Sequence, residues 1–292
     1  MDKVVHYLGM IFLLSVVSSC IRESSSECVS QYTIRVFVKD KNYSNVDAIS
    51  PQDKVDESLS FRKFVGTVYY TLSQLSTGAL VQESSVTSVT GDGDYLTLTL
   101  KDVPYGDYKL TVWGNNTTDA PVGNLHQSNQ EQTDIYLGSS DIKVDKTYLT
   151  SDITLQRTKG LLLVRFTNFP TYIKEIRANV TGVYESINPD FMYSGTTFVR
   201  KEAPFQMQSQ VLLAPSVGEG VSKLQLKLYT ATPTGETELA VTLPETPITV
   251  HRNEMSLVAV DYNVPTGKWE IWIYINGEWT KIHSLDVEEI SI

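Results

Sequence analysis

The sequence predicts an all-β protein with two tandem β-sandwich domains behind a short secretory segment. Short runs alternate apolar and polar side chains, as strands buried on one face do. Glycine, proline and aspartate separate these runs. We find no long stretch with apolar residues at the i, i+3, i+4 and i+7 positions of an amphipathic helix. Short strands with frequent turns favour β-sandwiches.

The first 19 residues have the pattern of a secretory signal. Lys3 precedes an apolar run, residues 8–17, which is shorter than the roughly 20 residues of a membrane-spanning helix. The run ends in Val-Ser-Ser-Cys, which is similar to a bacterial lipobox, with the small residue Ser19 before Cys20. We expect cleavage between Ser19 and Cys20 and a lipid on the Cys20 thiol. An ordinary cleaved signal and an uncleaved anchor are the alternatives.

The second cysteine, Cys28, is not expected to form a disulfide. A lipidated Cys20 has no thiol to share, and two cysteines make neither a disulfide scaffold nor a metal site. Cys28 would then be a small packed or idle residue. Residues 20–30 are polar and are predicted to be a tether between the lipid and the fold. We expect no cofactor besides the covalent lipid on Cys20.

Three alternating runs predict the strands of a first domain over residues 31–150. They are residues 33–39, 96–100 and 108–112. The segment Val-Pro-Tyr-Gly-Asp at 103–107 is expected to turn the second run into the third as a hairpin. The polar stretches 51–61 and 117–147 are predicted to be loops, with at most one short helix.

A second domain is predicted over residues 151–292. Residues 150–156 look like a connecting strand, and Gly160 then opens a fresh apolar run. Alternation at residues 224–228 and 271–275 predicts further strands. From residue 281 to the end the alternation breaks, because a change of parity moves side chains to the other face. This segment is either a final edge strand with a bulge or a strand available to another chain.

Composition argues against nucleic acid as a partner. The formal net charge is −10 and the pI is about 4.9, whereas nucleic-acid binding requires basic patches. Removing residues 1–19 takes away one lysine and one aspartate, so the net charge stays at −10. Docking on anionic lipid by charge is disfavoured for the same reason, so membrane attachment would depend on the lipid anchor.

No motif predicts an enzyme. His126, His251 and His283 lack partners at metal-ligand spacing, and we expect them to be solvated or packed. The sequence Gly-Asp-Gly-Asp-Tyr could suggest calcium at Asp92 and Asp94, but the full calcium loop is absent. We interpret it as a turn in which glycine supplies positive φ. A glycosidase pair of carboxylates would have to meet over a long range, and nothing singles one out.

Aromatic residues gather near the C-terminus. Trp272 and Tyr274 would project from one face of a strand, with Trp279 close by. Such rings could stack on sugars, and they could equally pack between domains or contact another protein.

Four stretches together are similar to one known family. They are CIRESSSEC, VPYGDYKLTVWGN, TKGLLLVRFTNFP and VHRNEMSLVAVDY. In order, they resemble the FimB-type fimbrial anchor and accessory lipoproteins of Bacteroidota, over essentially the whole chain after the signal. The matching positions are Gly106, Tyr108, Trp113, Gly114, Gly160, Asn168, Phe169 and Pro170.

The resemblance implies two transthyretin-like β-sandwiches, lipidation at Cys20 and a place in the outer membrane. It also implies a non-enzymatic structural role in adhesion, as the anchor or a minor subunit of a surface fimbrium. Fimbrial subunits would then be partners, by β-strand complementation or edge contact. The alternative function is a surface glycan-binding lipoprotein of a nutrient-capture system, with Trp272, Tyr274 and Trp279 as its contact platform.

Overall fold

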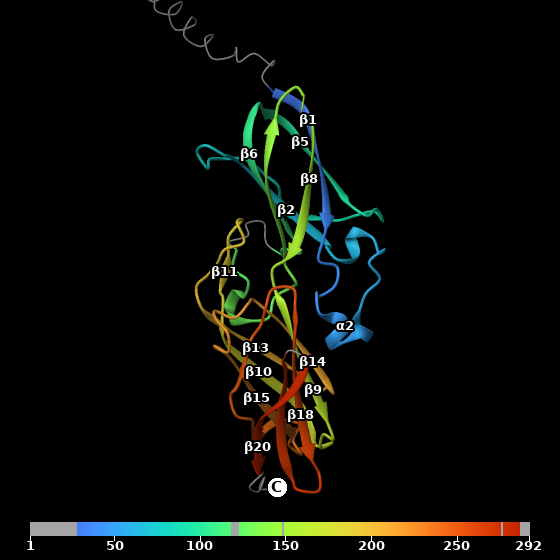
Figure 1. The fold of residues 1–292 in the computed structure, drawn as a ribbon, viewed down its shortest axis with the longest axis vertical. Coiled ribbons are helices and arrows are strands. Elements are labelled where there is room, and N and C mark those ends of the chain that lie inside the picture. Colours follow the sequence, from blue (N-terminus) through green and yellow to red (C-terminus); the bar gives the residue numbers. More distant parts are fainter. Residues whose placement is uncertain (1–27, 118–122, 148, 276, 287–292) are drawn as a thin grey trace, which may run out of the picture.

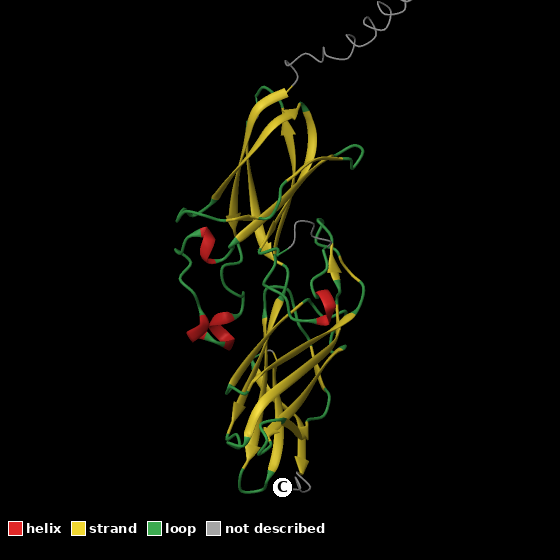
Figure 2. Cartoon of the chain, turned by 180° about the vertical axis from the view of Figure 1, so that it is seen from behind, coloured by secondary structure: helices red, strands yellow, loops and turns green. Residues whose placement is uncertain are grey.

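The molecule consists of two β-sandwiches stacked end to end (Figure 1). The structure is a computed structural model and describes residues 28–117, 123–147, 149–275 and 277–286. Strand β1 begins at one pole of the molecule and strand β20 lies at the other. Strands dominate (Figure 2), and the described helices are short. They are α2 (Val46–Ile49), η1 (Pro51–Asp53), η2 (Phe61–Lys63) and η3 (Gln127–Asn129). The predicted all-β class is confirmed.

The first domain is a single folded-over sheet with the strand order β3-β2-β6-β7-β8-β1-β5, and β4 pairs with β2. Strands β5, β1 and β8 face β2, β6 and β7 and enclose one apolar core. The strands are β1 (Cys28–Val38), β2 (Thr67–Gln74), β3 (Leu80–Glu83), β4 (Thr87–Ser88), β5 (Leu96–Pro104), β6 (Gly106–Gly114), β7 (Tyr136–Val144) and β8 (Thr150–Arg157).

The second domain packs two sheets, β13-β10-β15-β16 with β17 on β15, and β14-β9-β18-β19-β20. A separate hairpin, β11 with β12, lies near the first domain. The strands are β9 (Gly160–Thr167), β10 (Ile173–Val183), β11 (Ser186–Ile187), β12 (Tyr193–Ser194), β13 (Thr197–Pro204), β14 (Gln208–Leu213), β15 (Ser222–Ala231), β16 (Thr237–Thr242), β17 (Thr246–Ile248), β18 (Met255–Asn263), β19 (Lys268–Ile275) and β20 (Glu278–Asp286).

Alternation produces these strands where one face is buried. In β1, Ile34 and Val36 point into the core, and Arg35 between them is exposed. In β15, the leucines at 224, 226 and 228 do the same in the second domain. Strand β9 is buried on both faces, because one set of its side chains enters the core and Leu161 and Leu163 pack against α2. The predicted strands at these positions are confirmed.

The predicted hairpin at residues 103–107 is wrong. Strand β5 pairs with β1, whereas β6 pairs with β2 and β7, so the segment carries the chain from one layer to the other. The Tyr108 hydroxyl donates to the Pro104 carbonyl at 2.9 Å and secures this crossing. The alternation on both sides of the Val-Pro-Tyr-Gly-Asp segment therefore predicted two strands correctly, but it did not predict which strands they pair with.

The predicted loop at 117–147 is wrong in its last third, because β7 lies there. Its middle, Gly-Ser-Ser-Asp, hides the alternation that surrounds it. Gly138 is required by packing, since a Cβ at this position would lie 2.8 Å from the Thr154 carbonyl oxygen of β8. Because close packing requires glycine at this buried position, the sequence of β7 lacks an apolar side chain there, and the alternation that would predict a strand is interrupted.

The domain limits differ from the predicted ones by a few residues. Strand β8 pairs in parallel with β1, so residues 150–157 belong to the first sheet and the chain crosses at Thr158 and Lys159. Strand β1 starts at Cys28, inside the predicted tether of residues 20–30. The predicted signal and the sites at Ser19 and Cys20 lie outside the described residues.

Candidate functional site

The second sandwich ends in an edge strand. Among the described strands, β20 has one hydrogen-bonded neighbour, β19. Opposite Ile271 lies His283 and opposite Trp272 lies Lys281, so Ile282 is the additional residue of a β-bulge. The interpretation of this segment as a final edge strand with a bulge is confirmed as far as Asp286. An edge strand presents N–H and C=O groups that a further strand can pair with.

An apolar groove of about 700 Å³ lies beside this edge. Ile248 of β17 lines it from one sheet, and Ile273 and Ile275 of β19 line it from the other. Ile282 of the bulge and Ile49 of α2 complete the apolar lining. The side chain of Ile275 is 50% exposed, although it continues the buried row of β19. The groove is therefore apolar surface that the described residues do not cover.

Polar residues are part of the groove lining, among them His251 and Glu219, whose side chains lie 3.5 Å apart. Further polar contacts lie along β20 outside the groove. The His283 Nε2 atom lies 3.2 Å from the Glu245 carbonyl oxygen, which links β20 to the segment before β17. Lys281 and Glu270 form an ion pair at 2.8 Å between β20 and β19. An apolar centre with a polar rim is the usual composition of a protein contact surface.

The aromatic residues predicted as a contact platform are not coplanar. Tyr274 and Trp279 meet at 61° with their ring centroids 5.3 Å apart. Trp272 is half-buried, and the Lys281 Nζ atom lies 4.6 Å from its ring centroid. Nearby Trp269 is fully buried in the core. The three predicted residues thus lie close together but do not offer one flat face to a sugar.

The other sequence candidates do not assemble into a site. His126 is buried, and His251 is exposed beside Glu219. Asp92 accepts a hydrogen bond from Arg62 at 2.8 Å, and Gly91 adopts a φ of +89°, so this segment is the predicted glycine turn. Among the residues that the structure describes, no three histidine, cysteine, aspartate or glutamate side chains are grouped to hold a metal ion.

Sequence reasoning missed a buried charged cluster between the two domains. The Arg157 guanidinium donates to Asp134 at 2.6 Å, to the Tyr136 hydroxyl at 2.8 Å and to Asn253 at 2.9 Å. It also lies 4.0 Å from the centre of the Tyr43 ring. Burial is the largest single influence and opposes the charge, but the Asp134 carboxylate and the phenols of Tyr136 and Tyr43 together outweigh it and raise the pKa of Arg157. Burial raises the pKa of Asp134 as well.

Two further buried titratable groups join the domains. Lys159 is fully buried and donates to the carbonyls of Gln132 and Thr133 at 3.3 and 3.0 Å. Burial lowers its pKa to about 8. His126 accepts the backbone N–H of Ala214 at 2.8 Å. The sequence leads us to expect that His126 is solvated or packed, and the structure shows it packed. Nothing in the sequence indicated the burial of Lys159, because an isolated charged residue in a connecting segment is ordinarily solvated.

The comparisons with known proteins are structural. No protein-family model matches the chain, and no curated protein matches its sequence. A solved structure of a candidate adhesin from Bacteroides thetaiotaomicron superposes with a TM-score of 0.53 at 12% identity, over 87% of this chain and 98% of the adhesin. The chain shares the fold of that adhesin. This likeness concerns the fold, and it agrees with the all-β architecture that the sequence predicted.

Two other solved structures align over a similar length. The fimbrial anchor protein Mfa2 from Porphyromonas gingivalis is 12% identical over 87% of this chain and 100% of its own, with a TM-score of 0.49. A fimbrial assembly protein from Parabacteroides distasonis is 9% identical over 87% and 99%, with a TM-score of 0.46. The fold comparison rests on the adhesin. Within the described ranges, the helices are all too short or too polar to cross a bilayer.

Proposed function

We propose that the chain is a non-enzymatic structural lipoprotein of the outer membrane that anchors a surface fimbrium or forms one of its minor subunits. The lipobox-like segment at Ser19 and Cys20 supports the attachment to the membrane. The fold shared with a candidate adhesin supports a role at the cell surface. The names of the anchor and assembly proteins that align with the chain point in the same direction.

The observation that carries the proposal is the position of the open edge. Strand β1 begins at one pole of the molecule, and the lipid on Cys20 would precede it. Strand β20 extends toward the opposite pole (Figure 1). The groove lies at the end of the second sandwich nearer the domain junction, where α2 contributes to its lining. A molecule held at its first pole would therefore direct β20 away from the membrane, with the groove on its flank beside α2.

The partner would be an adjoining fimbrial subunit that contributes an extended segment. Its backbone would pair with the free edge of β20, and its apolar side chains would enter the groove at Ile275 and Ile282. The bulge at Ile282 increases the local twist of the edge, which disfavours pairing with strands of the wrong shape. The contact would need no metal or cofactor.

The test is recovery of fimbrial subunits with the protein from outer membranes. The full-length wild type should co-purify with them, and Ile275→Asp should lose them, because a carboxylate in an apolar contact must be desolvated without a partner. Val264→Asp is the matched control, since Val264 is 65% exposed in the turn between β18 and β19 and does not line the groove. Both variants should remain folded. Equal recovery with wild type and Ile275→Asp would contradict the proposed surface.

The glycan platform at Trp272, Tyr274 and Trp279 receives no comparable support, because the rings of Tyr274 and Trp279 are tilted and Lys281 covers Trp272. Adjacent genes distinguish the two functions independently. Fimbrial subunit genes beside this one favour the anchor, whereas a porin with glycoside hydrolases favours nutrient capture.

A further inference from the structure

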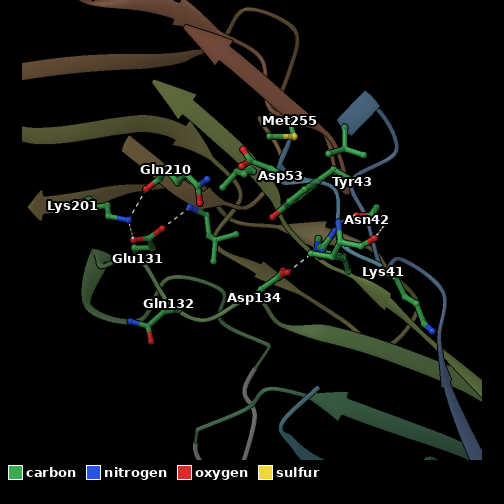
Figure 3. A pocket seen from close by; sticks show the side chains of 15 residues that line it. Lys41, Asn42, Tyr43, Asp53, Glu131, Gln132, Asp134, Lys201, Gln210 and Met255 are labelled. Atoms are coloured by element: carbon green, nitrogen blue, oxygen red, sulfur yellow. Dashed lines mark hydrogen bonds and ion pairs between the residues drawn. The ribbon is translucent and has the colours of Figure 1, made fainter. Parts of the chain in front are cut away.

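A second cavity lies between the two domains (Figure 3), and Met255 is the one lining residue that it shares with the groove. It has a volume of about 560 Å³, within the range of about 300–1,000 Å³ typical of small-molecule sites. The first domain contributes the segment around Tyr43 and the segment 131–134. The second domain contributes Gln210 and Leu212 of β14 and Met255 of β18. The cavity therefore exists only where the two domains meet.

The charges on its wall cancel. Three carboxylates and three cationic groups line the cavity: Asp53, Glu131, Asp134, Lys41, Arg157 and Lys201. Asp134 is paired with Arg157 at 2.6 Å and Glu131 with Lys201 at 2.6 Å. A strongly anionic or cationic ligand would meet as many like charges as opposite ones. The wall therefore favours a neutral ligand that both donates and accepts hydrogen bonds.

Several polar groups on the wall still lack a partner among the described residues. The buried Asp134 Oδ1 atom accepts no hydrogen bond, although the other oxygen of this carboxylate is paired. The Tyr43 hydroxyl and the Gln210 side-chain amide also make no hydrogen bond, and Figure 3 shows both side chains at the cavity. A buried acceptor without a donor requires a bound water or ligand to satisfy it. Hydroxyl groups suit this set, because each one donates to a carboxylate and accepts from an amide or a phenol.

Apolar surface accompanies these polar groups. Leu161, Leu212 and Met255 line the second-domain side of the cavity. The Tyr43 ring is held in place by the Arg157 guanidinium, 4.0 Å from its centre. Sugars combine a ring of hydroxyls with an apolar C–H face, and a pocket of this composition can satisfy both at once.

We propose that this interdomain cavity binds a neutral saccharide, either a free monosaccharide or the terminal unit of a longer glycan. Asp134 and Asp53 would accept from its hydroxyls, and Gln210 and Tyr43 would donate to them. The proposal does not depend on the fimbrial function, because the cavity shares neither β20 nor the aromatic residues at the C-terminus.

Saturation-transfer NMR on the full-length protein tests the proposal. The probes are glucose, galactose, mannose and N-acetylglucosamine, each neutral, with glucuronate and glucosamine as charged counterparts. At least one neutral sugar should bind at least about tenfold more tightly than the charged probes. Electrophoresis in affinity gels that contain dextran or mannan distinguishes a free monosaccharide from the terminal unit of a glycan. Retardation of the protein in the gel indicates binding to the end of a polymer, and unchanged migration indicates binding of a free sugar.

Variants locate the binding. Val55→Trp should abolish it, because Val55 lines the cavity with a 41% exposed side chain and the larger ring would fill the space without disturbing the core. Gln210→Ala should weaken it roughly three- to tenfold, the effect of one neutral hydrogen bond. Gln206→Ala, exposed nearby but outside this cavity, should leave it unchanged. Absence of binding by every neutral probe, equal binding of the charged ones, or full binding by Val55→Trp would overturn the proposal.

Discussion

His126 should make the folded protein sensitive to acid. Its Nε2 atom accepts the N–H of Ala214 at 2.8 Å, so the ring is neutral where the two domains meet. Burial, and after it the positive charge of Lys159, lowers the pKa of His126 to about 3. A histidine in the unfolded chain titrates near 6.5. The unfolded chain therefore takes up this proton first, and the stability present above about pH 6.5 is lost as the pH falls toward 3.

The size of the effect follows from these two pKa values. Each pH unit between them changes the free energy of unfolding by up to about 1.4 kcal/mol. At pH 5.0, about 1.5 units below the unfolded pKa, the loss relative to pH 7.5 is about 2 kcal/mol. This is a large part of the roughly 5–15 kcal/mol that stabilises a typical domain.

Urea unfolding at pH 7.5 and pH 5.0, followed by tryptophan fluorescence, measures the loss. His126→Gln is the comparison, because its amide oxygen can accept the Ala214 N–H and does not titrate. The carboxylates titrate in both proteins, so the difference between them isolates His126. The wild type should lose about 2 kcal/mol more than the variant. Equal losses of unfolding free energy in the two proteins would refute the conclusion that His126 is buried and neutral.

Three other changes test the core, the domain junction and the anchor. Gly160→Ala should destabilise the protein by at least about 2 kcal/mol in urea unfolding, because its Cβ would lie 2.2 Å from a backbone carbonyl oxygen; an unchanged midpoint would contradict this contact. Leu226→Asp should unfold the second domain, since it places an unpaired carboxylate at a 2% exposed core position. Circular dichroism measures the loss of strand signal, and a spectrum equal to that of the wild type would contradict this expectation. Cys20→Ala should abolish labelling by a fatty-acid probe and release the protein from the outer membrane, whereas Cys28→Ala should label normally; labelled Cys20→Ala would exclude the lipobox.

Much of the fold could be predicted because local periodicity and burial agree. The leucines of β15 alternate with lysine and glutamine, and the structure places them in the core. The same holds for Ile34 and Val36 of β1. Strand pairing could not be derived in this way. Strands β5 and β6 follow one another along the chain but join different layers, and only contacts between distant segments decide that arrangement.

The domain junction was not predictable, for a different physical reason. Arg157 and Lys159 have no apolar pattern, and their burial depends on acceptors far away along the chain or on backbone carbonyls. Asp134 lies 23 positions before Arg157 in a segment that seemed to be loop. The cost of burying such ions is offset only when the partners are already in place. Such a cluster of buried charges therefore forms only when the chain is folded, and local sequence does not predict it.

The crossing between the domains leaves little freedom to bend. Only Thr158 and Lys159 separate β8 from β9. The Thr158 N–H and hydroxyl both donate to the Ile135 carbonyl, at 3.0 and 2.7 Å, and its own carbonyl accepts from the Tyr193 hydroxyl at 2.7 Å. Because the polar groups of Thr158 and Lys159 are hydrogen-bonded to neighbouring segments, the connection between the two domains should be a rigid joint. The two sandwiches should therefore move as one body.

This joint matters if the chain carries load between a membrane and a fimbrium, as proposed. The pull would enter at the beginning of β1 and leave through the end of β8. These two strands are parallel, with pairs from Thr33 and Thr150 to Val38 and Leu155. A force that draws their opposite ends apart shears all the hydrogen bonds between them together, whereas a hairpin pulled at its two ends opens one bond at a time. The parallel pairing of the first strand with the last one of its domain should therefore resist the pull on the proposed anchor better than a hairpin pulled open at its two ends would.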